Sequence, residues 1–143
     1  MGESLKRDFL TAQLEYEETI QKRRRTSFIY YMNHLSDWAN RVGAELPHHL
    51  NREDRPSHLF PILMPDLNSR TRLIEHAKES QVFLTFHYVP LHHSPAGAEF
   101  GRITSEFHNT QQISDSLVRL PLFSDMSATD AIRVVEVVSK FHV

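Results

Sequence analysis

The chain has 143 residues, of which 40% are hydrophobic and 24% charged, as is typical of one globular domain. Its net charge of −2 gives no overall attraction to nucleic acid or an anionic membrane, and the absence of cysteine excludes disulfides, thiolate nucleophiles and cysteine-ligated zinc. No signal peptide is recognisable, and no apolar run approaches the roughly 20 residues that span a bilayer. We therefore expect a cytoplasmic protein without nucleic-acid or membrane partners.

Residues 5–42 are predicted to form one long helix, or two helices joined end to end. Apolar residues recur there mostly at three- and four-residue steps, and no proline or glycine occurs until Gly43, which is placed to end the helix. A single helix of this length is too long for an ordinary compact domain. We expect its first half to pack against something outside the domain.

A polar connector bounded by prolines follows at residues 44–57, with His48 and His49 expected as exposed loop residues. The short apolar run at 58–64 predicts a strand. Because Pro61 has no N–H to donate to a sheet, this strand is expected at an edge or a bulge.

The next helix is predicted to be capped by Asn68 or Ser69 and to run to about Ser80. Residues 81–88, QVFLTFHY, form the clearest predicted strand, because they are β-branched and aromatic and precede a run of breakers. The inner face of the helix is expected to carry Leu73, Ile74 and Ala77.

The remaining chain is predicted as a loop at 89–111, a short helix at 112–119 and a strand at 120–123. Ser127 and Asp130 have the spacing of a capping box, which predicts the start of a last helix. Its apolar stripe is expected to comprise Ile132, Val134, Val135, Val138 and Phe141.

This order of elements predicts an α/β fold, a two-layer sandwich of the α+β kind with a small sheet and helices on one face. We divide the chain into a long helix at 1–43, with an interdomain or oligomerisation role, and a small α/β domain at 44–143.

The segment FHYVPLHHSPAG, at 86–97, concentrates the residues with chemical potential. His87, His92 and His93 are possible metal ligands, but they lack the HExxH spacing and no carboxylate lies nearby before Glu99. Adjacent residues of a strand also point to opposite faces, so His87 and Tyr88 cannot both face one ion. We predict no metal site.

Catalysis by this segment alone is also disfavoured, because Ser94 lacks the GxSxG surroundings of a nucleophile elbow and four glycines provide no phosphate loop. A binding loop fits better, since two prolines stiffen the segment, histidines donate or accept, and Tyr88 adds a ring and a hydroxyl. Such a loop suits a polar ligand with a phosphate or several hydroxyls. The alternative is a histidine-rich surface turn without a ligand.

Several blocks of sequence resemble the sugar-nucleotide aminotransferases of the DegT/DnrJ/EryC1/StrS family, which are pyridoxal-phosphate enzymes, and within it the transaminases that form dTDP-4-amino-4,6-dideoxygalactose. The resemblance runs from about Asp8 to Val143. The blocks are FLTAQLE at 9–15, HLF at 58–60, LMPDL at 63–67, RTRLIEH at 70–76, FHYVPLH at 86–92, SPAG at 94–97 and LVRLPLF at 117–123.

The resemblance implies the small C-terminal domain of a fold-type I pyridoxal-phosphate transferase, preceded by its long connecting helix. The family's catalytic lysine lies in a large domain that has no counterpart among these residues. None of the lysines here, Lys6, Lys22, Lys78 and Lys140, has the family's lysine motif. We therefore expect no pyridoxal phosphate bound to this chain alone, and no activity.

The implied parent reaction moves an amino group from glutamate to the 4-keto carbon of a dTDP-linked 6-deoxyhexose, for surface polysaccharide synthesis. The resemblance makes His87, Tyr88 and His92 candidate contacts to sugar or phosphate, with His93 beside them where relatives often have a small or polar residue. The block at 119–123 is implied to be structural.

Three partners follow from the resemblance: a nucleotide-sugar, a separate chain carrying the lysine domain, and a second copy of this chain. The last is expected through residues 5–40, because Leu10, Leu14 and Ile20 would lack their large-domain partner. The alternative function is a non-catalytic module that binds nucleotide-sugar or a partner subunit.

Overall fold

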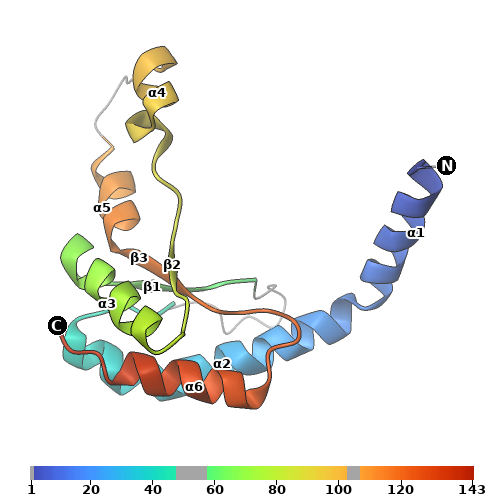
Figure 1. Cartoon of the computed structure of the whole chain (residues 1–143), viewed down its shortest axis with the longest axis horizontal. Coiled ribbons are helices and arrows are strands. Elements are labelled where there is room, and N and C mark those ends of the chain that lie inside the picture. The colour runs from blue at the N-terminus through green and yellow to red at the C-terminus, as the bar shows by residue number, and fades with distance from the viewer. Residues whose placement is uncertain (1, 48–57, 103–106) are drawn as a thin grey trace.

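The computed structural model describes residues 2–47, 58–102 and 107–143. Figure 1 shows the order of the elements along the chain. These are α1 (Gly2–Glu15), α2 (Glu17–Val42), β1 (Phe60–Leu63), α3 (Leu67–Glu79), β2 (Thr85–Phe86), the 3₁₀ helix η1 (Leu91–His93), α4 (Pro95–Phe100), α5 (His108–Ser116), β3 (Leu117–Leu120) and α6 (Ala128–Ser139).

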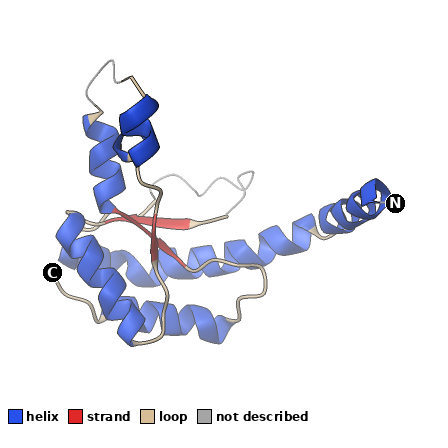
Figure 2. Cartoon of the chain, turned by 45° about the horizontal axis from the view of Figure 1, so that its top comes forward, coloured by secondary structure: helices blue, strands red, loops and turns tan. Residues whose placement is uncertain are grey.

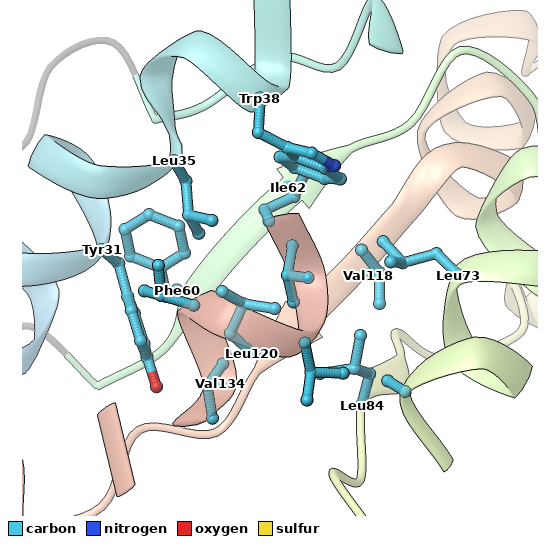
Figure 3. Close-up of a cluster of buried hydrophobic side chains, with 14 of the residues drawn as sticks. Tyr31, Leu35, Trp38, Phe60, Ile62, Leu73, Leu84, Val118, Leu120 and Val134 are labelled. Atoms are coloured by element: carbon cyan, nitrogen blue, oxygen red, sulfur yellow. The ribbon is translucent and has the colours of Figure 1, made fainter. Parts of the chain in front are cut away.

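A three-stranded antiparallel sheet has the order β1-β3-β2, and α2, α3 and α6 pack on one of its faces (Figure 2). Phe60 pairs with Leu120 and Ile62 with Val118, and all four side chains are buried against the helices. Figure 3 shows side chains from the helices and strands converging on this core. The predicted α/β fold is confirmed.

The second half of α2 supplies the largest buried side chains. The ring of Phe60 lies between those of Phe28 and Tyr31, with centroids 4.7 and 5.1 Å away. The Trp38 Nε1–H donates to the carbonyl oxygen of Phe141 at 3.1 Å. The chain end is therefore fixed to a helix formed near its beginning.

The predicted long helix is two helices separated at Tyr16. Gly43 ends α2 in the left-handed conformation, at φ 68°, as its position predicts. On α1, which projects away from the body in Figure 1, Leu10 and Leu14 are 60% and 63% exposed. Ile20 is half-buried.

The edge position of β1 agrees with the prediction from Pro61. The Leu63 N–H donates to the carbonyl oxygen of Glu45, on the side of β1 away from β3. Because alternate residues point their N–H groups to the same side, the nitrogen of Pro61 also faces away from β3. Its missing hydrogen therefore costs no bond to β3.

The predicted cap of α3 was wrong, because the capping side chain is Asp66. Its carboxylate accepts from the Ser69 N–H at 2.7 Å, and this bond lowers the pKa of Asp66. Leu73 and Ala77 are buried as predicted, and Ile74 is half-buried against the core.

The predicted strand at 81–88 is reduced to Thr85–Phe86. Continuing the register with β3 would place Phe83 opposite Pro121, which has no N–H, and Tyr88 opposite Ser116, which belongs to α5. Both ends of the ladder are therefore blocked by the partner strand.

The predicted helix at 112–119 and strand at 120–123 are displaced. In the structure α5 ends at Ser116 and β3 starts at Leu117, because Leu117–Leu120 pairs with β1 and the chain leaves the sheet at Pro121. The predicted loop at 89–111 also contains η1, α4 and the start of α5.

The capping box of α6 is present: Ser127 Oγ accepts from the Asp130 N–H, and the Asp130 carboxylate accepts from the Ser127 N–H.

The buried face of α6 differs from the predicted stripe at one residue: Ile132 is 41% exposed, which contradicts its assignment to that stripe. It lies beside a cavity between α2 and α6, while the buried stripe consists of Ala131, Val134, Val135, Val137, Val138 and the following Phe141.

Two expectations remain, on the connector histidines and on membrane-spanning helices. His48 and His49 lie outside the described residues. Among the helices that the structure describes, none combines the length and apolar character that crossing a membrane requires.

Candidate functional site

All four predicted site residues lie on one projecting segment, residues 87–102, which we call the arm. It leaves the sheet after β2, and α4 lies near its tip (Figure 1). The Ser94 hydroxyl donates to the Leu91 carbonyl oxygen at 2.7 Å and accepts from the Gly97 N–H at 3.0 Å. A Cβ at Gly97 would lie 1.6 Å from that carbonyl oxygen, so only glycine fits the turn.

The arm separates the predicted residues into two pairs. His87 and Tyr88 lie at its root, with ring centroids 4.8 Å apart. His92 and His93 lie on η1, with ring centroids 4.4 Å apart, and the ring of His92 also lies 4.9 Å from that of Phe107. No hydrogen bond or ring contact within the described ranges joins the two pairs. Their assignment as substrate contacts stays a prediction.

These side chains are available to a ligand. Tyr88 is 75% exposed, His87 and His93 are exposed, and His92 is half-buried. In the part of the chain that the structure describes, no three His, Asp or Glu side chains come together as a metal site.

Two arginines hold the root of the arm. Arg119 donates through an η nitrogen to the Phe86 carbonyl oxygen at 3.2 Å, and its guanidinium carbon lies 5.9 Å from the centroid of the Tyr88 ring. Arg70 lies over the Phe86 ring at 5.3 Å and donates to the Ser114 carbonyl oxygen at 2.6 Å. The direction in which the arm leaves the sheet is therefore set from both faces.

Arg119 lies on the face of the sheet opposite α2, α3 and α6, which we call the open face. Pro61 and Thr85 are its partners on the neighbouring strands, so the three side chains share this face. None of them is buried. Sequence reasoning missed Arg119 and Arg70 as site residues. The available signal for Arg119 was a single charged residue in an otherwise apolar strand.

A cavity of about 300 Å³ lies between the end of β1 and α5. It shares Leu63 with the open face but includes none of the four predicted residues. It is lined by Gly43, Glu45, Leu63, Met64, Pro65, Asn109, Gln112, Ile113 and Ser116.

Residues 7–139 match the DegT/DnrJ/EryC1/StrS aminotransferase family, and the chain belongs to this family. An uncharacterised protein of Methanocaldococcus jannaschii is 27% identical over 133 residues, which are 90% of this chain and 33% of that protein. The UDP-4-amino-4-deoxy-L-arabinose–oxoglutarate aminotransferase of Shewanella sediminis is 34% identical over 77 residues, 50% of this chain and 20% of that enzyme.

The fold is also found in solved structures. DesV of S. venezuelae, in complex with a ketimine intermediate, superposes with a TM-score of 0.79 at 23% identity, over 92% of this chain and 34% of DesV. The chain thus spans about one third of the length of the Methanocaldococcus protein and of DesV, and corresponds to the C-terminal part of the aminotransferase fold.

The described lysines lie away from the arm and the open face. Solved members of the family carry pyridoxal phosphate or PMP, and covalent attachment of pyridoxal phosphate requires a lysine amine. The described lysine side chains, Lys22, Lys78 and Lys140, are exposed on α2, on α3 and after α6. None of these three lies on the arm or the open face.

Proposed function

We propose that this chain is the substrate-binding small domain of a sugar-nucleotide 4-aminotransferase. The reaction would transfer an amino group from glutamate to the 4-keto carbon of a dTDP-linked 6-deoxyhexose, with pyridoxal phosphate as carrier. The family match over residues 7–139 carries the proposal. The similarity of half the chain to an enzyme named for a UDP-amino-sugar and oxoglutarate supports a nucleotide-sugar and a dicarboxylic acid as substrates.

In this proposal the arm binds the substrate. His87, Tyr88 and His92 offer ring and hydroxyl groups that can donate to phosphate oxygens and exchange hydrogen bonds with sugar hydroxyls. Leu91 and Phe100 on the same arm are 83% and 79% exposed. Because large apolar side chains exposed together favour association, we expect a further protein surface to cover the arm and complete the site.

That surface would belong to a lysine-bearing domain, on the same polypeptide or on a separate chain. Because the described lysines lie away from the arm, we expect residues 1–143 alone to be inactive. A second copy of the chain is expected to bind through α1, where Leu10 and Leu14 are exposed.

The second candidate is a non-catalytic module that binds nucleotide-sugar or a partner subunit. The observation that favours it is the position of the described lysines, all away from the arm. Such a module would bind ligand but would not gain activity when a lysine-bearing domain is added.

A complementation experiment tests the proposal. The chain would be co-expressed with the lysine-bearing domain of a family member and assayed with pyridoxal phosphate, glutamate and a dTDP-4-keto-6-deoxyhexose. We expect amino-sugar formation only when both parts are present, and a large loss of activity in His92→Ala. His142→Ala, an exposed histidine away from the arm, is the matched control.

Two results would contradict the proposal. One is an assembled complex that binds pyridoxal phosphate but forms no amino-sugar. The other is equal activity of His92→Ala and the parent, which would remove the arm from the substrate site.

A further inference from the structure

We propose that Arg119 is an oxyanion-binding residue, which binds a diphosphate or a carboxylate of the substrate on the open face at the root of the arm. This inference rests on the proposed function for the identity of the substrate. The anion site itself belongs to the described residues and can be tested without the lysine-bearing domain.

The hydrogen-bonding capacity of Arg119 is mostly unused. A guanidinium has five N–H donors, and in the described part of the chain only one bond is made, to the Phe86 carbonyl oxygen. The Nε atom is buried and has no hydrogen-bond partner. Because Nε is buried, the donors open to an anion are the N–H groups of the η nitrogens that the Phe86 bond does not use.

The charge of Arg119 also has no acidic neighbour within the described ranges. Arg23, in contrast, forms an ion pair with Asp125 at 3.0 Å. The charge of Arg72 contributes to the lowered pKa of Asp66. Arg119 is half-buried in the middle strand of the sheet, and no described carboxylate lies within 4 Å of it. A ligand can therefore neutralise its positive charge.

The guanidinium of Arg119 is held in place before any ligand arrives. The Phe86 carbonyl oxygen accepts a hydrogen bond from one η nitrogen, and the guanidinium carbon lies over the Tyr88 ring. Less side-chain freedom is then lost on binding, and the planar group can offer two parallel N–H donors to a phosphate or carboxylate.

The surroundings extend this cation into a polar site. The Tyr88 ring next to the guanidinium contacts the His87 ring, so a cation, a phenol and an imidazole follow one another at the arm root. An anion bound at Arg119 would place the rest of its molecule near these two side chains. Arg119 thus adds a fixed positive charge beside the hydrogen-bonding groups of His87 and Tyr88.

The test follows the side-chain Nε–Hε signal of Arg119 by NMR on the ¹⁵N-labelled chain, with Arg119→Lys used to assign it. Inorganic pyrophosphate represents the diphosphate and glutamate the carboxylate, each added at constant ionic strength. We expect a saturable shift with at least one anion. The anion that binds more tightly identifies the source of the oxyanion.

Arg119→Gln, read from the backbone amides of Phe86 and Tyr88, should weaken the apparent Kd about tenfold, as expected for loss of a charge-assisted contact. Arg72→Gln is the matched control, because Arg72 also donates to a carbonyl oxygen, that of His142, and lies over an aromatic ring. It should leave the Kd unchanged.

The proposal is overturned if the Arg119 signal shifts only linearly with both anions, or if Arg119→Gln and Arg72→Gln weaken binding equally. If Arg119→Gln does not fold, the wild-type titration and Arg119→Lys still decide the question. A saturable anion site together with failed complementation would retain this inference and reject the proposed aminotransferase function.

Discussion

Removing the hydroxyl of Tyr31 should destabilise the fold by a measurable amount. This side chain is fully buried, and its hydroxyl donates to the Pro121 carbonyl oxygen at 2.9 Å and contacts Met126 Sδ at 3.6 Å. Tyr31→Phe keeps the ring but leaves the carbonyl oxygen without this donor, which costs about 1–2 kcal/mol. With an m-value of about 2 kcal/mol/M, the urea midpoint should fall by about 0.5–1 M.

The assay is urea unfolding followed by the fluorescence of Trp38, the only tryptophan, which is buried in the core. Tyr30→Phe is the control, because that residue is half-buried and stacks on His34, with no hydrogen bond from its hydroxyl among the described residues. Its midpoint should stay close to wild type. Equal losses in the two variants would refute the role assigned to the Tyr31 hydroxyl.

The pH dependence gives an independent check on Tyr31. Burial, and secondarily the charge of Asp130, raise the pKa of Tyr31 above its ordinary value of 10.0. The unfolded chain therefore ionises this group first, and stability should fall as the pH rises above 10.0. Tyr31→Phe should lose stability less steeply over that alkaline range, whereas Tyr30→Phe should follow the wild type.

Three further predictions concern a cap, a turn and a surface. Ser127→Ala should lower the free energy of unfolding by about 1 kcal/mol, because its hydroxyl caps α6; an unchanged thermal midpoint would argue against the cap. Gly97→Ala should shift NMR signals throughout the arm while leaving the urea midpoint of the core nearly unchanged, since the clash is with the Leu91 carbonyl oxygen; undisturbed arm signals would contradict this geometry. Leu14→Glu should convert the expected oligomer to a monomer in light scattering, and a wild-type monomer at high concentration would exclude self-association through α1.

Elements set by local spacing were predictable from the sequence. The capping box at Ser127 marks the start of α6, and Gly43 marks the end of α2, because both signals act within a few residues. The position of β3 was not predictable in this way. Residues 117–123 are mostly apolar, so the sequence allows a strand to begin at more than one position, and the pairing with β1 fixes it at Leu117–Leu120.

The candidate site shows the same limit. The segment at 86–97 was recognisable as a binding loop from its prolines, histidines and Tyr88. The histidines and Tyr88 fall into two separate pairs because the backbone turns within the segment, and the sequence does not show that turn. The start of α4 after Ser94 was more accessible, because Ser followed by Pro is a usable signal for a helix start. Arg119 was missed because a strand sequence does not tell which face of its sheet stays open.

The bond between Trp38 and the Phe141 carbonyl oxygen has a consequence for synthesis. It joins residues 103 positions apart, and α2 packs on α6 across a similar separation. Because a chain emerges from the ribosome at about 5–20 residues per second, the apolar face of α2 stays uncovered for several seconds before α6 follows. Tyr31, Leu35 and Trp38 are then a ready target for chaperones or for aggregation. Slower translation of residues 43–127 should therefore increase losses to aggregates.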